Sequence, residues 1–238
     1  MNTPPVLARM EQLISAWSAA EDRRDAFLRC YRMMTVNMHT AIARGEFADG
    51  AWVELLLRRF ADYYFEALAQ WDADTDTAPR VWQRAHACTR DPEAMVWQQL
   101  ILGVNAHINY DLVLTVHELL DAEWGTMSGE VRRRRVDDYC RVNAIIAATI
   151  DAVQDDVLAP AMPVSAILDR LLGRVDEYMI SRLITSWRDQ TWSDAVRLLE
   201  NPDPAHRQEI IAGVEGRAMR LASLIGPGTQ RDLQDTEI

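Results

Sequence analysis

The sequence predicts an all-α fold, a single domain of about eight or nine helices packed around one buried central helix. Apolar residues recur at three- and four-residue spacings along most of the chain, which is typical of amphipathic helices. No segment alternates apolar and polar residues as a half-buried strand does. From Ala94 to Trp124 there is no proline, and apolar residues dominate. Because a helix that is apolar on all sides belongs inside a bundle, we expect this segment to be the central helix.

Helix start and stop signals divide the chain before the central helix. Pro4-Pro5 can begin a helix, since proline is tolerated in the first turn. Asp22 and Asp49 are suitable N-caps because a carboxylate accepts a hydrogen bond from a free backbone N–H group, and Gly45 is suited to end a helix. The helices predicted here begin at Pro4-Pro5, extend from Asp22 to Ala43 and from Ala51 to Trp71, and finish with a short one from Val81 to Thr89.

Prolines and glycines divide the part of the chain after the central helix. Pro160 and Pro163 break the chain, and Asn201-Pro-Asp-Pro204 is a turn. The residues after Gly226 are expected to form a flexible tail. We therefore predict one helical domain over residues 1–225 and a flexible tail over 226–238. The helices predicted here run from Ser128 to about Val157, from Val164 to Leu172, from about Asp176 to Leu199 and from the turn to Ile225.

The charge of the chain excludes several classes of function. The formal net charge is −11, and all 25 basic residues are arginine. An excess of negative charge disfavours nonspecific binding to nucleic acid or to anionic lipid. The chain has no lysine, which excludes lysine Schiff-base and P-loop chemistry. We therefore expect no nucleic-acid partner, and the oligomeric state stays open.

The N-terminal residues predict a cytoplasmic protein, and the apolar runs predict no membrane span. Cys30, Cys88 and Cys140 are odd in number and widely spaced, which argues against a disulfide framework and against a cysteine-rich zinc site. The longest apolar runs are interrupted by polar residues, so we expect no membrane-spanning helix. Met1-Asn-Thr-Pro-Pro5 has neither the basic start nor the apolar core of a signal peptide.

Four polar residues interrupt the apolar central helix: Asn105, His107, Asn109 and Asp111. His107 and Asp111 are four residues apart and share a face, with Gly103 one turn earlier. Asn105 and Asn109 form a second pair roughly half a turn away. Gly103 would let a neighbouring helix or a ligand approach closely. Each buried polar group needs a partner, because an unpaired one costs about 1–3 kcal/mol.

Two interpretations of this polar stretch remain open. The four side chains can form a hydrogen-bonded network that only fixes the helix register, as buried polar residues usually do. Alternatively, they form a ligand or metal site, since His107 and Asp111 at this spacing suit a divalent metal such as zinc. Asn143 is expected to be a further buried polar residue, and Arg188 could hold an anionic group of a substrate.

The chain resembles a family of mostly bacterial proteins catalogued as domain of unknown function 5995. The resemblance spans most of the chain and is strongest at Leu102-Gly-Val-Asn-Ala-His-Ile-Asn-Tyr-Asp-Leu112. It implies an all-helical fold and no particular activity. Weaker parts of the resemblance are Arg59-Phe-Ala-Asp-Tyr-Tyr-Phe65, Asp138-Tyr-Cys-Arg-Val-Asn143 and Arg188-Asp-Gln-Thr-Trp192.

A shorter segment resembles zinc-dependent phospholipase C and its nuclease relatives. In the pattern LGxxxHxxxDxxxxxH, the first histidine, the aspartate and the last histidine bind zinc, which by resemblance gives His107, Asp111 and His117. Those enzymes also use an N-terminal tryptophan and further histidines, whereas this chain starts with Met1 and has 5 histidines. A three-zinc cluster is therefore not carried over. The side chains available to complete a smaller metal site are Asp138, His86 and Glu118.

The sequence leaves two hypotheses for the function. The first is an enzyme with a buried polar pocket, a metal-dependent hydrolase of a small ester or phosphoester. His107 and Asp111 would then be metal ligands or an acid–base pair, with Asn105 and Asn109 beside them and Asn143 and Arg188 toward the ligand. The second is a non-catalytic helical module that binds a small molecule or a protein partner.

Overall fold

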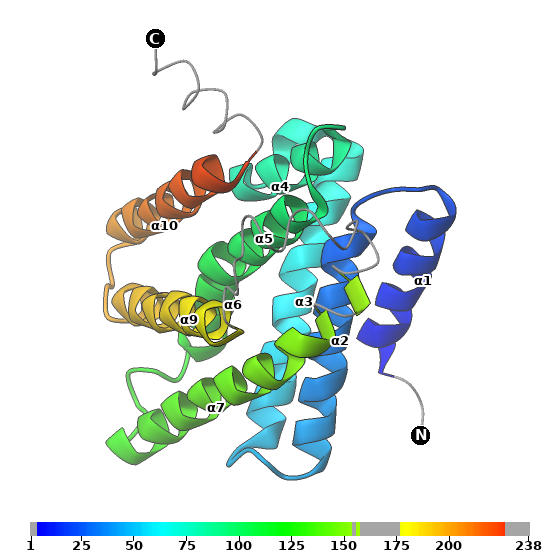
Figure 1. The fold of residues 1–238 in the computed structure, drawn as a ribbon. Helices are drawn as coiled ribbons and strands as arrows, with labels where there is room; N and C mark the ends of the chain where they lie inside the picture. The colour runs from blue at the N-terminus through cyan, green and yellow to red at the C-terminus, as the bar shows by residue number, and fades with distance from the viewer. Residues whose placement is uncertain (1–3, 154–155, 158–176, 227–238) are drawn as a thin grey trace.

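The first helices of the chain follow the predicted boundaries closely. The computed structural model describes residues 4–153, 156–157 and 177–226. Asp49 caps α3 as predicted, its carboxylate accepting from the Trp52 N–H group, and Gly45 after α2 has a positive φ. Figure 1 shows α2 and α3 side by side, with α1 on the outer side of α2. The bounds are Pro5–Ala19 for α1, Asp25–Ala43 for α2, Gly50–Ala73 for α3, Thr75–Thr77 for the 3-10 turn η1 and Arg80–Arg90 for α4.

The predicted N-cap of α2 was wrong by two residues. Asp22 is not the N-cap, because Arg24 occupies that position and makes no side-chain cap. The Asp22 carboxylate instead accepts from the Arg24 backbone N–H and from the Arg24 guanidinium. Asp22 therefore stabilises the turn that precedes α2.

The central helix is present where the sequence predicts it, but it is not a uniform α-helix. It consists of α5 (Val96–Ala106), the π-helical turn η2 (His107–Asp111) and α6 (Leu112–Leu120). At the end of this turn, the Leu112 N–H donates to the carbonyl of His107, five residues back. π-helical turns inside α-helices are rare and are frequently found at functional sites. Here the wide turn coincides with the polar stretch.

The later helices complete the bundle around this centre. Helices α2, α4 and α10 pack against α5, whereas α3 and α9 pack against α6, and α7 packs against α2 and α9 (Figure 1). The predicted helix from Val164 to Leu172 and the tail over 227–238 lie outside the described residues. The described part of the chain is all α-helical apart from its turns, as predicted. The bounds are Gly129–Val153 for α7, Glu177–Leu199 for α9 and Pro204–Ile225 for α10.

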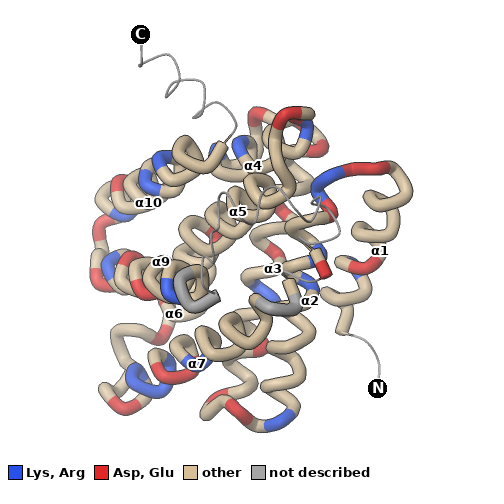
Figure 2. The backbone as a smooth tube through the Cα atoms, in the orientation of Figure 1, with Lys and Arg blue, Asp and Glu red and all other residues tan. Residues whose placement is uncertain are grey.

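The core consists of two apolar clusters that meet at the central helix. One gathers side chains of α1, α2, α3, α4, α5 and α10, and includes Met10, Leu28 and Trp82. The other gathers side chains of α2, α3, α6, α7, α9 and α10, and includes Val116 and Leu198. Figure 2 shows charged residues in the loops and along the outer helices, while α5 carries none. The polar residues of the central helix therefore lie where two apolar clusters join.

In the described residues, no helix is long and apolar enough to cross a membrane.

Candidate functional site

His107 and Asp111 form a buried pair inside the π-helical turn. Nδ1 of His107 lies 2.9 Å from Oδ2 of Asp111, and the two residues are 3% and 1% exposed. The indole Nε1–H of Trp82, from α4, donates to both carboxyl oxygens of Asp111 at 3.1 and 3.0 Å. Nε2 of His107 has no hydrogen-bond partner among the described residues. The prediction that His107 and Asp111 share one face is thus confirmed. Trp82 joins them as the third residue of one hydrogen-bonded group.

Burial disfavours electrical charge in this pair. It lowers the pKa of His107 well below its ordinary value and raises the pKa of Asp111 well above its own, although the hydrogen bond from Trp82 opposes the second shift. The neutral state that follows has a protonated Asp111 that donates to Nδ1 of an uncharged imidazole. In that state the imidazole proton is on Nε2, which makes Nε2 a hydrogen-bond donor.

Aromatic rings surround the imidazole of His107. The Phe60 ring from α3 stacks on it with centroids 3.5 Å apart and planes 6° apart. The Tyr31 ring from α2 meets it edge-on at a centroid distance of 4.5 Å. Phe27, Tyr64 and Trp82 lie further out, with centroids about 6 Å away. These rings supply the low-dielectric surroundings that keep the imidazole neutral.

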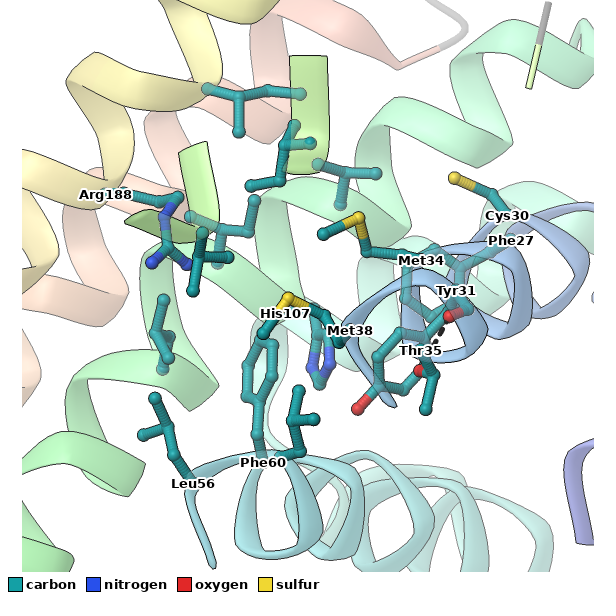
Figure 3. A pocket seen from close by; sticks show the side chains of 17 residues that line it. Phe27, Cys30, Tyr31, Met34, Thr35, Met38, Leu56, Phe60, His107 and Arg188 are labelled. Carbon is teal, nitrogen blue, oxygen red and sulfur yellow. Dashed lines mark hydrogen bonds between the residues drawn. The ribbon is translucent and has the colours of Figure 1, made fainter. Parts of the chain in front are cut away.

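A cavity of about 130 Å³ lies next to His107, between five parts of the bundle. Its wall is almost entirely apolar, and the side chains that form it come from α2, α3, the central helix, α7 and α9 (Figure 3). The polar exceptions that matter chemically are His107 and Arg188. The lining residues are Phe27, Cys30, Tyr31, Met34, Thr35, Met38, Leu56, Leu57, Phe60, Val104, His107, Ile108, Leu112, Val142, Ile146, Ile184 and Arg188.

Arg188 and Asn143 come together beside this cavity. Arg188 is 4% exposed, and its Nε donates to Oδ1 of Asn143 at 2.7 Å. Its Nη2 donates to the Tyr139 carbonyl at 2.8 Å, and the guanidinium lies over the Tyr139 ring at 4.2 Å. Asn143 is half-buried rather than buried, and it positions Arg188 without lining the cavity.

Asn105 and Asn109 also form the predicted pair, but they serve another contact. Nδ2 of Asn109 donates to Oδ1 of Asn105 at 3.0 Å, and Nδ2 of Asn105 donates to the Ala218 carbonyl at 2.9 Å. This chain of bonds attaches the central helix to α10. Neither asparagine lines the cavity beside His107, so the structure separates the two pairs that the sequence analysis placed in one site.

The residues considered for a metal are dispersed. Within the described ranges, no group of three or more His, Cys, Asp or Glu side chains is arranged to hold a metal ion. Nε2 of His117 lies 3.5 Å from Asp121, on α6 beyond the π turn. The binding of a metal by His107, Asp111 and His117 therefore stays a prediction that this arrangement does not support.

The three further side chains considered for the metal have other contacts. Asp138 accepts from the backbone N–H groups of Ala48 and Asp49, just before α3. Glu118 accepts hydrogen bonds from the Arg59 guanidinium and the Tyr63 hydroxyl. The third side chain, His86, stacks on the Trp82 ring with centroids 5.3 Å apart. Each of them stabilises packing between helices.

Gly103 allows the approach of a helix rather than of a ligand. A Cβ atom built on Gly103 would lie 2.5 Å from the ring of Phe27. The space that the glycine leaves is thus occupied by α2, which brings Phe27 and Tyr31 against the central helix. The aromatic surroundings of His107 depend on this close contact.

The fold and the site define an all-α protein with a buried His–Asp pair beside an apolar cavity. The chain belongs to the family described as a family of unknown function, DUF5995, whose model matches residues 4–226. This match confirms the resemblance that the sequence analysis identified. Neither the curated proteins nor the solved structures gave a match, and no comparison supports the likeness to zinc-dependent phospholipase C.

Proposed function

We propose that this protein binds a small, mainly apolar molecule in the cavity beside His107. The observation that carries this proposal is a cavity of about 130 Å³ whose wall is almost entirely apolar. Protein interiors contain few voids larger than a water molecule. Small-molecule sites are concave, mostly apolar and supplied with a few polar groups that orient the ligand. Here His107 and Arg188 are such groups.

The size and the lining of the cavity limit the ligand. An apolar cavity of about 150 Å³ accommodates one benzene molecule, so a body of at most about six carbon atoms suits this smaller one. Met34 and Met38 on α2 line it, and methionine side chains adapt to ligands of different shape. Cys30 also lines it, but burial raises the pKa of its thiol to about 12, which leaves the thiol protonated and weakly nucleophilic. These features favour binding over covalent chemistry.

The binding proposal is tested with a neutral probe. We expect 1-hexanol to bind the purified protein in isothermal titration calorimetry and to raise its melting temperature. Met34→Trp should abolish this binding, because an indole at the cavity wall would occupy much of a 130 Å³ space. The control is Leu183→Trp on α9, where the side chain is 48% exposed and outside the cavity lining. Failure of 1-hexanol and benzene to bind the wild-type protein would exclude the proposal.

A second candidate function is acid–base catalysis on the bound molecule. The observation that favours it is the Asp111–His107 hydrogen bond, which orients the imidazole and leaves Nε2 without a partner among the described residues. A carboxyl group that orients a histidine is the usual arrangement of a general acid or base. Ester hydrolysis assayed on short-chain p-nitrophenyl esters tests this candidate, and His107→Gln should remove any activity found.

The metal-dependent form of the hydrolase hypothesis needs ligands beyond His107 and Asp111. Elemental analysis of protein purified without added metal tests it directly. A stoichiometric metal that His107→Gln removes would support it, and the lack of both a metal and a metal-induced thermal shift would end it.

The proposal places this binding in the cytoplasm of a bacterial cell. Its support is that Cys30, Cys88 and Cys140 are all free thiols, as is usual for proteins of a reducing compartment. Fractionation of cells that express the tagged protein tests this part.

A further inference from the structure

Arg188 is a buried cation without a counter-ion in the described part of the chain. It is 4% exposed, and no carboxylate there lies within 4.0 Å of its nitrogens. Its hydrogen bonds go to the neutral side chain of Asn143 and to the carbonyl of Tyr139. Burial of a charge is unfavourable unless the charge is paired. An arginine that only joined α7 to α9 would not need its charge, because both of its acceptors are neutral.

The guanidinium of Arg188 is available to the cavity. Its Nη1 group makes no hydrogen bond to a described residue, and Arg188 lines the same cavity as His107. Figure 3 shows the side chain extending from α9 with its guanidinium toward the space between the helices, on the side of the view opposite Cys30. Asn143 and the Tyr139 ring hold the other edge and one face of the group. The orientation of the charge is therefore fixed before a ligand arrives.

We infer that the molecule bound in this cavity is a small monocarboxylate, with its carboxylate on Arg188 and its apolar body along the apolar wall that includes Phe60. This inference rests on the proposed function and names the ligand class. A planar guanidinium matches a planar carboxylate, and the charge-assisted bonds are strong. A single arginine in an apolar wall suits a monoanion, because a phosphate dianion would need further donors and cations. Among the described residues, Arg188 is the arginine whose side chain is buried.

The test compares three ligands that share a six-carbon chain: hexanoate, 1-hexanol and hexylamine. In isothermal titration calorimetry on the full chain we expect hexanoate to bind at least about tenfold more tightly than 1-hexanol, as one charge-assisted bond would give. Hexylamine should bind most weakly, because its ammonium would face Arg188. Arg188→Gln keeps a hydrogen-bond donor but removes the charge, and should cancel the preference for hexanoate over 1-hexanol.

The control for the loss of a positive charge is Arg133→Gln, at an exposed position of α7. It should leave all three affinities unchanged. Should Arg188→Gln fail to fold, as judged by circular dichroism, Arg188→Lys keeps the charge without the planar fork and should retain only part of the preference.

The outcomes separate the inference from the proposed function. If 1-hexanol binds the wild-type protein but hexanoate binds no better, or if Arg188→Gln keeps the preference, the carboxylate assignment is overturned and the cavity proposal stands. If none of the three ligands binds, both fail. A preference for hexanoate that disappears in Arg188→Gln and persists in Arg133→Gln establishes the inference.

Discussion

The imidazole of His107 lies in contact with Phe60 on one face and with Tyr31 at its edge, and it is bonded to Asp111. Helical spacing identified the bond to Asp111, since residues four apart in one helix are neighbours whatever else the chain does. Helical spacing could not predict the hydrogen bond to Asp111 from Trp82, because Trp82 lies on a different helix, α4. A tryptophan that donates into a buried carboxyl group leaves no local signal in the sequence.

The first prediction concerns Asp111→Asn. The amide can accept from Trp82 and donate to Nδ1 of His107, so it preserves the bonds of a protonated Asp111. Because the pKa of Asp111 is raised in the folded state, the stability that this group contributes is present below the carboxyl pKa of the unfolded chain and is lost as the pH rises through the folded pKa. Asparagine does not titrate, so we expect a variant of near wild-type stability at pH 4.5 and of greater stability at pH 8.

Urea unfolding at the two pH values measures this difference. The prediction is contradicted if Asp111→Asn lowers the free energy of unfolding by more than about 1 kcal/mol at both pH values. That result would show that the hydrogen bonds among Trp82, Asp111 and His107 require the carboxyl group itself.

The π-helical turn is the feature of the central helix that matters most for the site. It widens the helix from His107 to Asp111, where the polar pairs lie on two sides. The periodicity of apolar residues predicted the helix, but one π turn shifts the register by too little to be visible in such a pattern. The sequence likewise did not predict the contact of α5 with α2. Gly103 indicated that a neighbour could approach closely, but not which helix that neighbour would be.

The second prediction tests this contact with Gly103→Ala. The added Cβ would meet the Phe27 ring at 2.5 Å, which forces α2 away from α5. We expect a net destabilisation of about 1–3 kcal/mol by thermal unfolding, because overpacking outweighs the gain in helix propensity. Phe27→Leu in the same chain should recover part of the loss.

The matched control is Gly213→Ala in the middle of α10, where a Cβ meets nothing within 4 Å. Helix propensity then acts alone, and the melting temperature should rise. An equal rise for Gly103→Ala would refute the role of the close contact.

At the scale of the whole molecule, two buried neutral histidines make the fold sensitive to acid. Burial lowers the pKa of His86 to about 3 and that of His107 well below its ordinary value. The unfolded chain takes up a proton at each histidine below about pH 6.5, whereas the folded chain does so only at lower pH. Stability from these groups is therefore present above that pH and is lost as the pH falls toward the folded pKa.

The third prediction isolates the contribution of His86. As the pH falls from 7 to 4.5, the effect of His86 should lower the free energy of unfolding of the wild-type protein by about 2–3 kcal/mol. This figure follows from about 1.4 kcal/mol for each pH unit below the pKa of an unfolded histidine. His86→Phe retains an aromatic ring between Trp71 and Trp82 and does not titrate. The variant should therefore lose less stability than the wild type over this range in urea unfolding. The exposed His206→Gln is the control, and equal pH dependence in all three proteins would contradict the prediction.

The sequence by itself determined the features that depend on neighbours along the chain. These are the helical class, most helix boundaries, the Asp49 cap, the central position of the apolar helix and the two polar pairs within it. Helical geometry fixes which residues three and four apart meet, and burial follows from the apolar pattern. Such features require no knowledge of how the helices are arranged.

Only the tertiary structure decided which residues share the site. It brought Arg188 of α9 and the rings of α2 and α3 to the cavity beside His107, directed Asn105 toward α10 and left His117 elsewhere on α6. The physical reason is that contacts between helices depend on how side chains of distant segments interlock, and many arrangements share the same apolar periodicity. Close contacts between distant segments, such as that of Gly103 with Phe27, select one of these helix arrangements. A local sequence pattern does not predict such contacts.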